Sequence, residues 1–247
     1  MEAIKNSTTV KISPVIDLLG RSWGVLKDNF WRFIGMMLIP VLGVLPLAVV
    51  FILNGVLTFL GADNLVVMFL KYILVLVGII SVIFLIVMAI ISQVGLFVLI
   101  KSLPERVAIK TAFFEAKKIA WRFFVLNLLT GLLVFGWTLL LLIPGLIAVV
   151  NYCFALWILV SEGRGGIGAI KGSRELVRGY WWAVAGRLLC LQLLIFVVIA
   201  TPTLFIKNDT FLVAWGLVSQ LISFISTPLS LAYSYFMYQD LKRIKNV

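Results

Sequence analysis

Long runs of apolar residues alternate along this chain with shorter segments that carry almost all of its charge. Uninterrupted apolar runs of about 18 residues or more are typical of helices that cross a membrane. The pattern predicts six spans, at about residues 31–56, 72–100, 123–143, 146–160, 182–206 and 211–238. The connections at 61–64, 144–145 and 207–210 are very short. We therefore expect the spans to pair as three hairpins, over residues 31–100, 121–160 and 182–240.

The charged segments before the hairpins have the spacing of amphipathic helices. Residues 12–30, 105–120 and 165–181 each place apolar side chains at helical intervals on one face and basic side chains on the other. Basic amphipathic helices of this kind lie in the headgroup plane of a bilayer. The predicted fold is therefore an all-α integral membrane protein with six transmembrane helices, a single polytopic domain over residues 1–247. Each hairpin is expected to follow a basic interfacial helix.

Two of these segments resemble an internal repeat. Ala108-Ile109-Lys110 precedes Trp121-Arg122-Phe123 with the same spacing at which Ala169-Ile170-Lys171 precedes Tyr180-Trp181-Trp182. A more divergent copy ends at Trp31. Tryptophan and arginine at the junction between an interfacial helix and a span are typical of membrane-interface anchors. We expect this role for Trp31, Trp121, Trp181 and Trp182.

The basic residues are distributed very unevenly, and this determines the predicted topology. All of the 21 lysines and arginines except Lys71 and Lys207 fall in four groups on the same side of the predicted spans. Basic loops stay in the cytoplasm. We therefore expect a multi-pass protein of the inner (plasma) membrane with both termini cytoplasmic. The net charge of +11 lies beside hydrophobic spans, which favours anionic lipid headgroups over nucleic acid as its partner.

The sequence offers little material for catalysis. It has no histidine, which excludes histidine bases, catalytic triads and histidine-ligated metals. Its two cysteines, Cys153 and Cys190, lie in apolar runs and are interpreted as structural. There are no paired carboxylates at useful spacing. We expect a protein that is not an enzyme and that has no cofactor or metal.

Several amides lie inside the predicted spans. The main ones are Asn54, Gln93, Asn127, Asn151, Gln192 and Gln220. Amides in membrane helices commonly form hydrogen bonds between helices. The alternative is a polar path for a transported solute, lined by Asn127, Asn151 and Gln220. No span carries an acid at mid-depth, although a coupled carrier usually needs one.

One stretch resembles a known family. It runs from Ile143-Pro144-Gly145 through Phe154-Ala155-Leu156 and Glu162-Gly163 to the segment 168–182, with Ala169, Ser173, Leu176 and Gly179 at the motif positions. This pattern is similar to the membrane domain attached to some glycerophosphoryl diester phosphodiesterases, and to related uncharacterised bacterial polytopic proteins. The resemblance implies a membrane module. Catalysis in the fused enzymes belongs to a separate soluble domain with histidines, so no catalytic residue is carried over to this chain.

The sequence thus favours a non-enzymatic membrane module that engages anionic lipid or a partner protein, including a second copy of itself, through a basic cytoplasmic collar. A small transporter or channel is the alternative. The candidate lipid-headgroup ligands are Lys110, Lys117, Lys118, Arg122, Lys171, Arg174 and Arg178.

Overall fold

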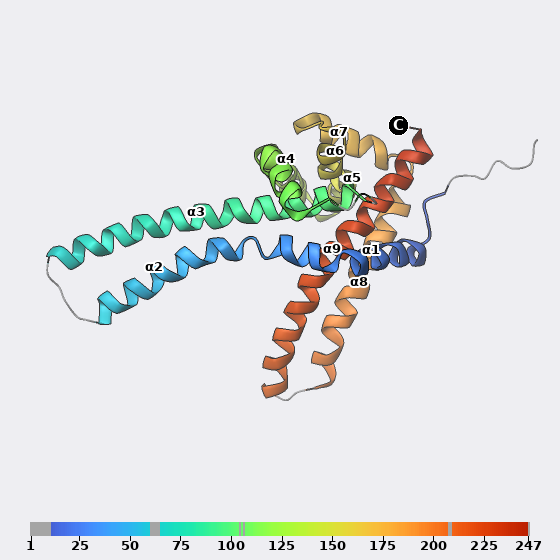
Figure 1. Cartoon of the computed structure of the whole chain (residues 1–247). Helices are drawn as coiled ribbons and strands as arrows, with labels where there is room; N and C mark the ends of the chain where they lie inside the picture. The colour runs from blue at the N-terminus through green and yellow to red at the C-terminus, as the bar shows by residue number, and fades with distance from the viewer. Residues whose placement is uncertain (1–10, 60–64, 104, 106, 207–208, 247) are drawn as a thin grey trace, which may run out of the picture. The chain divides into compact units, whose positions relative to one another are not determined.

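The computed structural model describes residues 11–59, 65–103, 105, 107–206 and 209–246. These residues form nine α-helices (Figure 1): α1 (Val15–Met37), α2 (Val41–Phe59), α3 (Leu65–Lys101), α4 (Ile109–Leu140), α5 (Leu142–Tyr152), α6 (Ala155–Glu162), α7 (Gly166–Val177), α8 (Trp181–Phe205) and α9 (Asp209–Lys245). The expected connection at 61–64 and the first half of the one at 207–210 lie outside the described residues, as do the basic residues Lys5, Arg106 and Lys207.

Six helical segments within the described residues are long and apolar enough to cross a bilayer. They are Val15–Phe59, Leu65–Lys101, Ile109–Leu140, Leu142–Glu162, Trp181–Thr203 and Thr210–Lys245. The prediction of an all-α membrane fold with six apolar helices is therefore confirmed. The order of these segments along the chain is the order that the apolar runs predict.

The chain forms two compact units, and each is described by itself. Unit 1 comprises residues 1–30 and 122–247, and unit 2 comprises residues 31–121. Helices α1 and α4 each contribute one part to unit 1 and the other part to unit 2.

In unit 2, α2 packs along α3 (Figure 1). The two helices approach closely at Gly43, which is buried and where an added Cβ would lie 2.7 Å from the Cα of Leu85. Small residues allow this kind of backbone contact between membrane helices. The hydroxyl of Ser92 donates a hydrogen bond of 2.8 Å to the carbonyl of Met36, which joins α3 to the end of α1.

Most of the α2–α3 pair presents apolar side chains outward. Phe59 is 91% exposed and Ile80 is 65% exposed. Surfaces this apolar are not found on soluble proteins but are normal where acyl chains surround a helix. The exposure therefore agrees with the membrane assignment of both helices.

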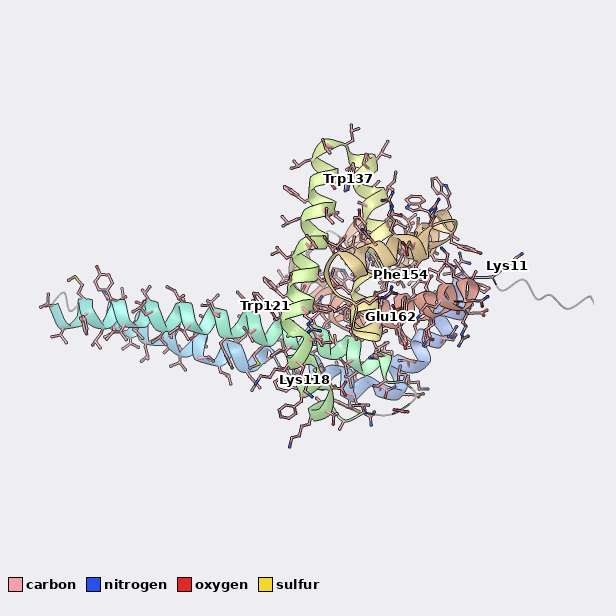
Figure 2. All side chains as sticks on the ribbon, turned by 90° about the horizontal axis from the view of Figure 1, so that it is seen from above. Lys11, Lys118, Trp121, Trp137, Phe154 and Glu162 are labelled. Atoms are coloured by element: carbon pink, nitrogen blue, oxygen red, sulfur yellow. The ribbon has the colours of Figure 1, made fainter. Side chains whose placement is uncertain are left out.

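In unit 1, the short helix α6 is the buried element. Trp157 is only 1% exposed; its ring centroid lies 4.8 Å from that of Tyr235, and its indole nitrogen donates a hydrogen bond of 3.0 Å to the hydroxyl of Ser234. Phe154 packs near Tyr238 on the same side. Figure 2 shows Phe154 and Glu162 among densely packed side chains, and Trp137 well away from them toward the far end of α4. Helices α8 and α9 run side by side (Figure 1).

The fourth predicted span is not one continuous helix. It breaks at Cys153 and Phe154 into α5 and α6, and a break inside a membrane leaves backbone groups without partners. Here the hydroxyl of Ser173, on α7, fills the gap. It accepts a hydrogen bond of 3.1 Å from the amide of Phe154 and donates one of 2.7 Å to the carbonyl of Asn151. Ser173 therefore fixes α7 against the break.

Other boundaries also differ from the predicted ones. The turn expected at Pro144-Gly145 lies at Leu141, whose backbone is extended, and Pro144 falls in the first turn of α5. Proline is well tolerated in a first helical turn, where its missing N–H has no partner to lose. Gly145 instead makes room for the neighbouring Thr138 of α4. The first predicted span, 31–56, is interrupted by a turn at 38–40, just before α2 begins.

Only the third predicted interfacial helix is a separate element. Residues 109–121 contain neither glycine nor proline, and they continue without interruption into the rest of α4. The first segment continues through a kink at Asn29 to the end of α1. In the third segment, Gly179 adopts a φ of 89°, a conformation that favours glycine, and this residue separates α7 from α8. The two copies of the proposed repeat thus differ in structure. The copy with this glycine forms a separate helix, and the copy without it continues into α4.

The close contact at Gly43 leads to a first prediction. Gly43→Ala should lower the free energy of unfolding by about 1–3 kcal/mol, because the added methyl group collides with the backbone of α3. The measurement is the unfolding midpoint of the purified protein in detergent. Gly55→Ala is the control, since it lies on the same helix with nothing within 4 Å of its Cβ position and has the same gain in helix propensity. Equal midpoints for the two variants would contradict the packing.

The bridge at Ser173 leads to a second prediction. Ser173→Ala should cost about 1–3 kcal/mol, because one buried and one partly buried backbone group lose their partner. The same unfolding measurement tests it. Ser223→Ala removes an exposed hydroxyl that bonds only within α9, and we expect it to leave the midpoint nearly unchanged. A Ser173→Ala variant as stable as this control would show that the break does not depend on Ser173.

Candidate functional site

Helix α7 has one buried and one exposed face. Ala169, Ile170, Ser173, Leu176 and Val177 are buried, whereas Lys171, Arg174 and Arg178 are exposed. This division follows the 3.6-residue period that the sequence predicts for the segment. Three of the four motif positions therefore lie on the buried face of α7: Ala169, Ser173 and Leu176. The fourth, Gly179, lies in the connection between α7 and α8.

The exposed face of α7 borders a pocket of about 510 Å³. Its lining residues are Asn151 from the end of α5, then Lys171, Arg174, Glu175 and Arg178. The structure therefore brings three of the seven predicted headgroup ligands together around one hollow. It also places there Asn151, which the sequence suggested for a transport path.

The basic side chains of this pocket have no ion-pair partner in the part of the chain that the structure describes. Among the described residues, no carboxylate oxygen lies within 4.0 Å of a side-chain nitrogen of Lys171, Arg174 or Arg178. The lining therefore combines three positive charges with the single negative charge of Glu175. A concave surface with this excess of positive charge attracts anions.

A second acidic residue nearby is fully engaged. Glu162, at the end of α6, accepts hydrogen bonds of 2.6 Å from Tyr238, 3.0 Å from Lys242 and 2.8 Å from Nε of Arg164. These contacts connect α6 to α9 beside a smaller hollow of about 100 Å³, which Glu175 also lines. Lys245 of α9 donates to the carbonyls of Glu175 and Arg178. The end of α9 is thus held against α7, next to the basic pocket.

The segment before α1 is held by residues of α8 and α9, and we call this arrangement the N-terminal clamp. The guanidinium group of Arg187 donates hydrogen bonds of 2.9 Å to the carbonyls of Ile12 and Ser13. Asp240, only 6% exposed, accepts one of 3.1 Å from the amide of Ser13 and lies 3.7 Å from Arg21. The clamp joins the two ends of the chain within unit 1.

The remaining predicted ligands lie elsewhere on the chain. Lys110, Lys117 and Lys118 are exposed along the part of α4 that belongs to unit 2, and Arg122 is exposed where α4 enters unit 1. The predicted anchors Trp31, Trp121 and Trp182 are highly exposed, Trp182 at 83%. Trp181 is partly covered and meets Trp182 edge to face, with ring centroids 4.7 Å apart.

The three amides suggested for a transport path have different surroundings. Asn151 lines the basic pocket, whereas Asn127 and Gln220 are exposed on α4 and α9. The contacts that Glu162, Arg187 and Asp240 form with distant segments were not predicted from the sequence. The sequence shows only that these charged residues lie next to long apolar helices. That position does not distinguish a side chain in solvent from one that forms hydrogen bonds.

Comparisons with known proteins add no relative to this picture: no protein-family model, curated protein or solved structure matches the chain. The helices define the class, an all-α multi-pass membrane protein. The resemblance to the phosphodiesterase-linked membrane domain thus stays a prediction.

The N-terminal clamp leads to a third prediction. Arg187→Lys should release the segment around Ile12, because an ammonium group cannot reproduce the forked contacts of a guanidinium. Trypsin should then cleave after Lys11 about tenfold faster, as a loss of about 1–2 kcal/mol implies; mass spectrometry of the fragment that begins at Ile12 measures this. Arg243→Lys, at an exposed position of α9, is the control. Equal cleavage in both variants would contradict the clamp.

Proposed function

We propose that this protein is a non-enzymatic polytopic membrane module that binds anionic lipid through its basic residues. The observation that carries the proposal is the pocket beside α7, where Lys171, Arg174 and Arg178 have no ion-pair partner among the described residues. Each cation close to an anionic membrane surface contributes about 1 kcal/mol to binding. Three such cations together contribute about 3 kcal/mol.

The proposed arrangement in the membrane follows from charge and length. Six spans pair as three hairpins, and the basic groups form a collar on the cytoplasmic side of the inner membrane, with both termini there. The uneven distribution of lysine and arginine supports this orientation. Contacts in unit 1 also support it, because the N-terminal clamp and the bonds from Lys242 and Lys245 bring three of the four basic groups together.

The binding proposal is tested by native mass spectrometry of the full chain in mild detergent. We expect bound anionic phospholipid. Retention should fall at least tenfold, on about 1 kcal/mol per charge, when all seven candidates are changed to glutamine: Lys110, Lys117, Lys118, Arg122, Lys171, Arg174 and Arg178.

The control exchanges only the four lysines of this set for arginine, which keeps all seven charges and all three guanidinium groups, and it should retain the lipid. Unchanged lipid in the neutralised variant would overturn the proposal. A bound polar solute in place of lipid would favour the transporter, and a bound protein would favour a scaffold.

A further inference from the structure

The seven basic candidates differ in what surrounds them. Lys110, Lys117 and Lys118 follow one another on the exposed surface of α4. By contrast, Lys171, Arg174 and Arg178 line a hollow of about 510 Å³ together with Asn151 and Glu175. Hollows of about 300–1,000 Å³ are of the size that encloses a small ligand. The pocket therefore has the shape for one bound molecule, whereas the α4 surface has only charge.

The chemistry of the pocket matches a phosphate ester. Two arginines offer planar, forked donors that suit phosphate oxygens, and Lys171 adds a point charge. In the neighbouring cluster, by contrast, Arg164 and Lys242 both bind Glu162. Glu162 offsets part of the positive charge of that cluster, whereas the three cations of the basic pocket have no ion-pair partner among the described residues. The basic pocket therefore has the stronger attraction for an anion.

The two other lining residues point to hydroxyl groups on the ligand. Glu175 supplies carboxylate oxygens, which only accept hydrogen bonds. The backbone carbonyl of Asn151 is occupied by Ser173, which leaves its side-chain amide to donate or accept. A ligand with phosphate alone would face the repulsion of Glu175. A ligand that also carries hydroxyl groups gains hydrogen bonds from the same carboxylate.

The position of the pocket favours a lipid over a free phosphate ester. Asn151 lies on α5 within the candidate span Leu142–Glu162, and the apolar side chain of Ile147, one helical turn before Asn151 on the same face of that helix, is exposed. On the other side, Arg178 is followed closely in the chain by Trp181 and Trp182, residues typical of the membrane interface. A headgroup in the pocket thus has an apolar helix surface available for its acyl chains.

We infer that this pocket, lined by Asn151, Lys171, Arg174, Glu175 and Arg178, binds the headgroup of a single anionic phospholipid in which a phosphodiester carries a hydroxylated group, as in phosphatidylglycerol. Lys171, Arg174 and Arg178 bind the phosphate, and Glu175 and Asn151 bind the hydroxyl groups. This inference rests on the proposed function and assigns it to one site and one headgroup class.

The site is tested with two matched triple variants of the full chain. One changes Lys171, Arg174 and Arg178 to glutamine, and the other changes Lys110, Lys117 and Lys118 to glutamine, so that both lose three charges at exposed positions. Phosphatidylglycerol is titrated into each protein in detergent, and bound lipid is counted by native mass spectrometry. We expect the α7 variant to bind about tenfold or more weakly. The α4 variant should change by less than about threefold, because its lysines lie outside the pocket, where solvent and salt screen them from the bound headgroup.

The outcomes separate the site from the general function. Equal losses in the two variants would overturn the pocket but leave the proposed lipid binding in place. If neither triple variant loses lipid binding, or if the variant with all seven residues changed to glutamine keeps it, both the pocket and the proposed function would be overturned. Circular dichroism and unfolding midpoints equal to those of the unaltered protein confirm that each variant is folded.

The headgroup class is tested by competition. Phosphatidylglycerol and phosphatidic acid, a phosphomonoester lipid without headgroup hydroxyl groups, are offered in equal amounts, and we expect the first to predominate. Glu175→Gln should reduce that preference by about threefold or more, because it replaces a charged acceptor with a weaker neutral one and removes the repulsion of the doubly charged phosphate. A preference for phosphatidic acid in the unaltered protein, or one that Glu175→Gln does not change, would overturn the headgroup assignment.

The source of the phosphate ester is tested with soluble competitors. Glycerol 1-phosphate and inorganic phosphate are added separately at the concentration of the bound phosphatidylglycerol and then at about a hundredfold excess. We expect neither to displace the lipid at equal concentration, since neither gains from burial of acyl chains. Displacement at equal concentration would show that the pocket binds a soluble anion instead.

Discussion

A helix that breaks inside a membrane exposes backbone amides and carbonyls where no water is present to bind them. This constraint acts at Cys153 and Phe154, and the hydroxyl of Ser173 satisfies it by bonding to both sides of the break. Since Ser173 lies on α7, the same two hydrogen bonds fix that amphipathic helix against the span. They thereby place Asn151 beside the basic face of α7 and create the pocket.

Charge at this end of unit 1 is divided into two parts with different roles. Glu162 pairs with Arg164 and Lys242, Asp240 pairs with Arg21, and both carboxylates join segments that are distant in the sequence. Lys171, Arg174 and Arg178 remain without an acidic partner among the described residues. Because an ion pair offsets part of the attraction for an anionic headgroup, the second group is the one that we propose to hold a lipid. The basic residues with structural contacts thus differ from those with the proposed lipid-binding role in whether a carboxylate lies within reach.

Prediction from the sequence succeeded where a rule depends on local composition. Six apolar helices and the amphipathic character of α7 follow from hydrophobic runs and from the 3.6-residue period. It was less accurate at the turns. Pro144-Gly145 has the composition of a turn, yet Pro144 falls in the first turn of a helix and Gly145 makes room for Thr138. The expected interfacial helix at 105–120 continues into α4 because no glycine or proline ends it.

The sequence by itself determined that the chain belongs in a membrane, which segments are apolar enough to cross it, and which residues carry the charge. These properties depend on the transfer free energy of side chains, which adds up along the chain. Only the tertiary structure decided that Asn151 meets Lys171, Arg174 and Arg178, that Glu162 is surrounded by partners, and that Arg187 holds the carbonyls of Ile12 and Ser13. Those contacts join residues far apart in the chain, and their geometry depends on how the helices pack against one another.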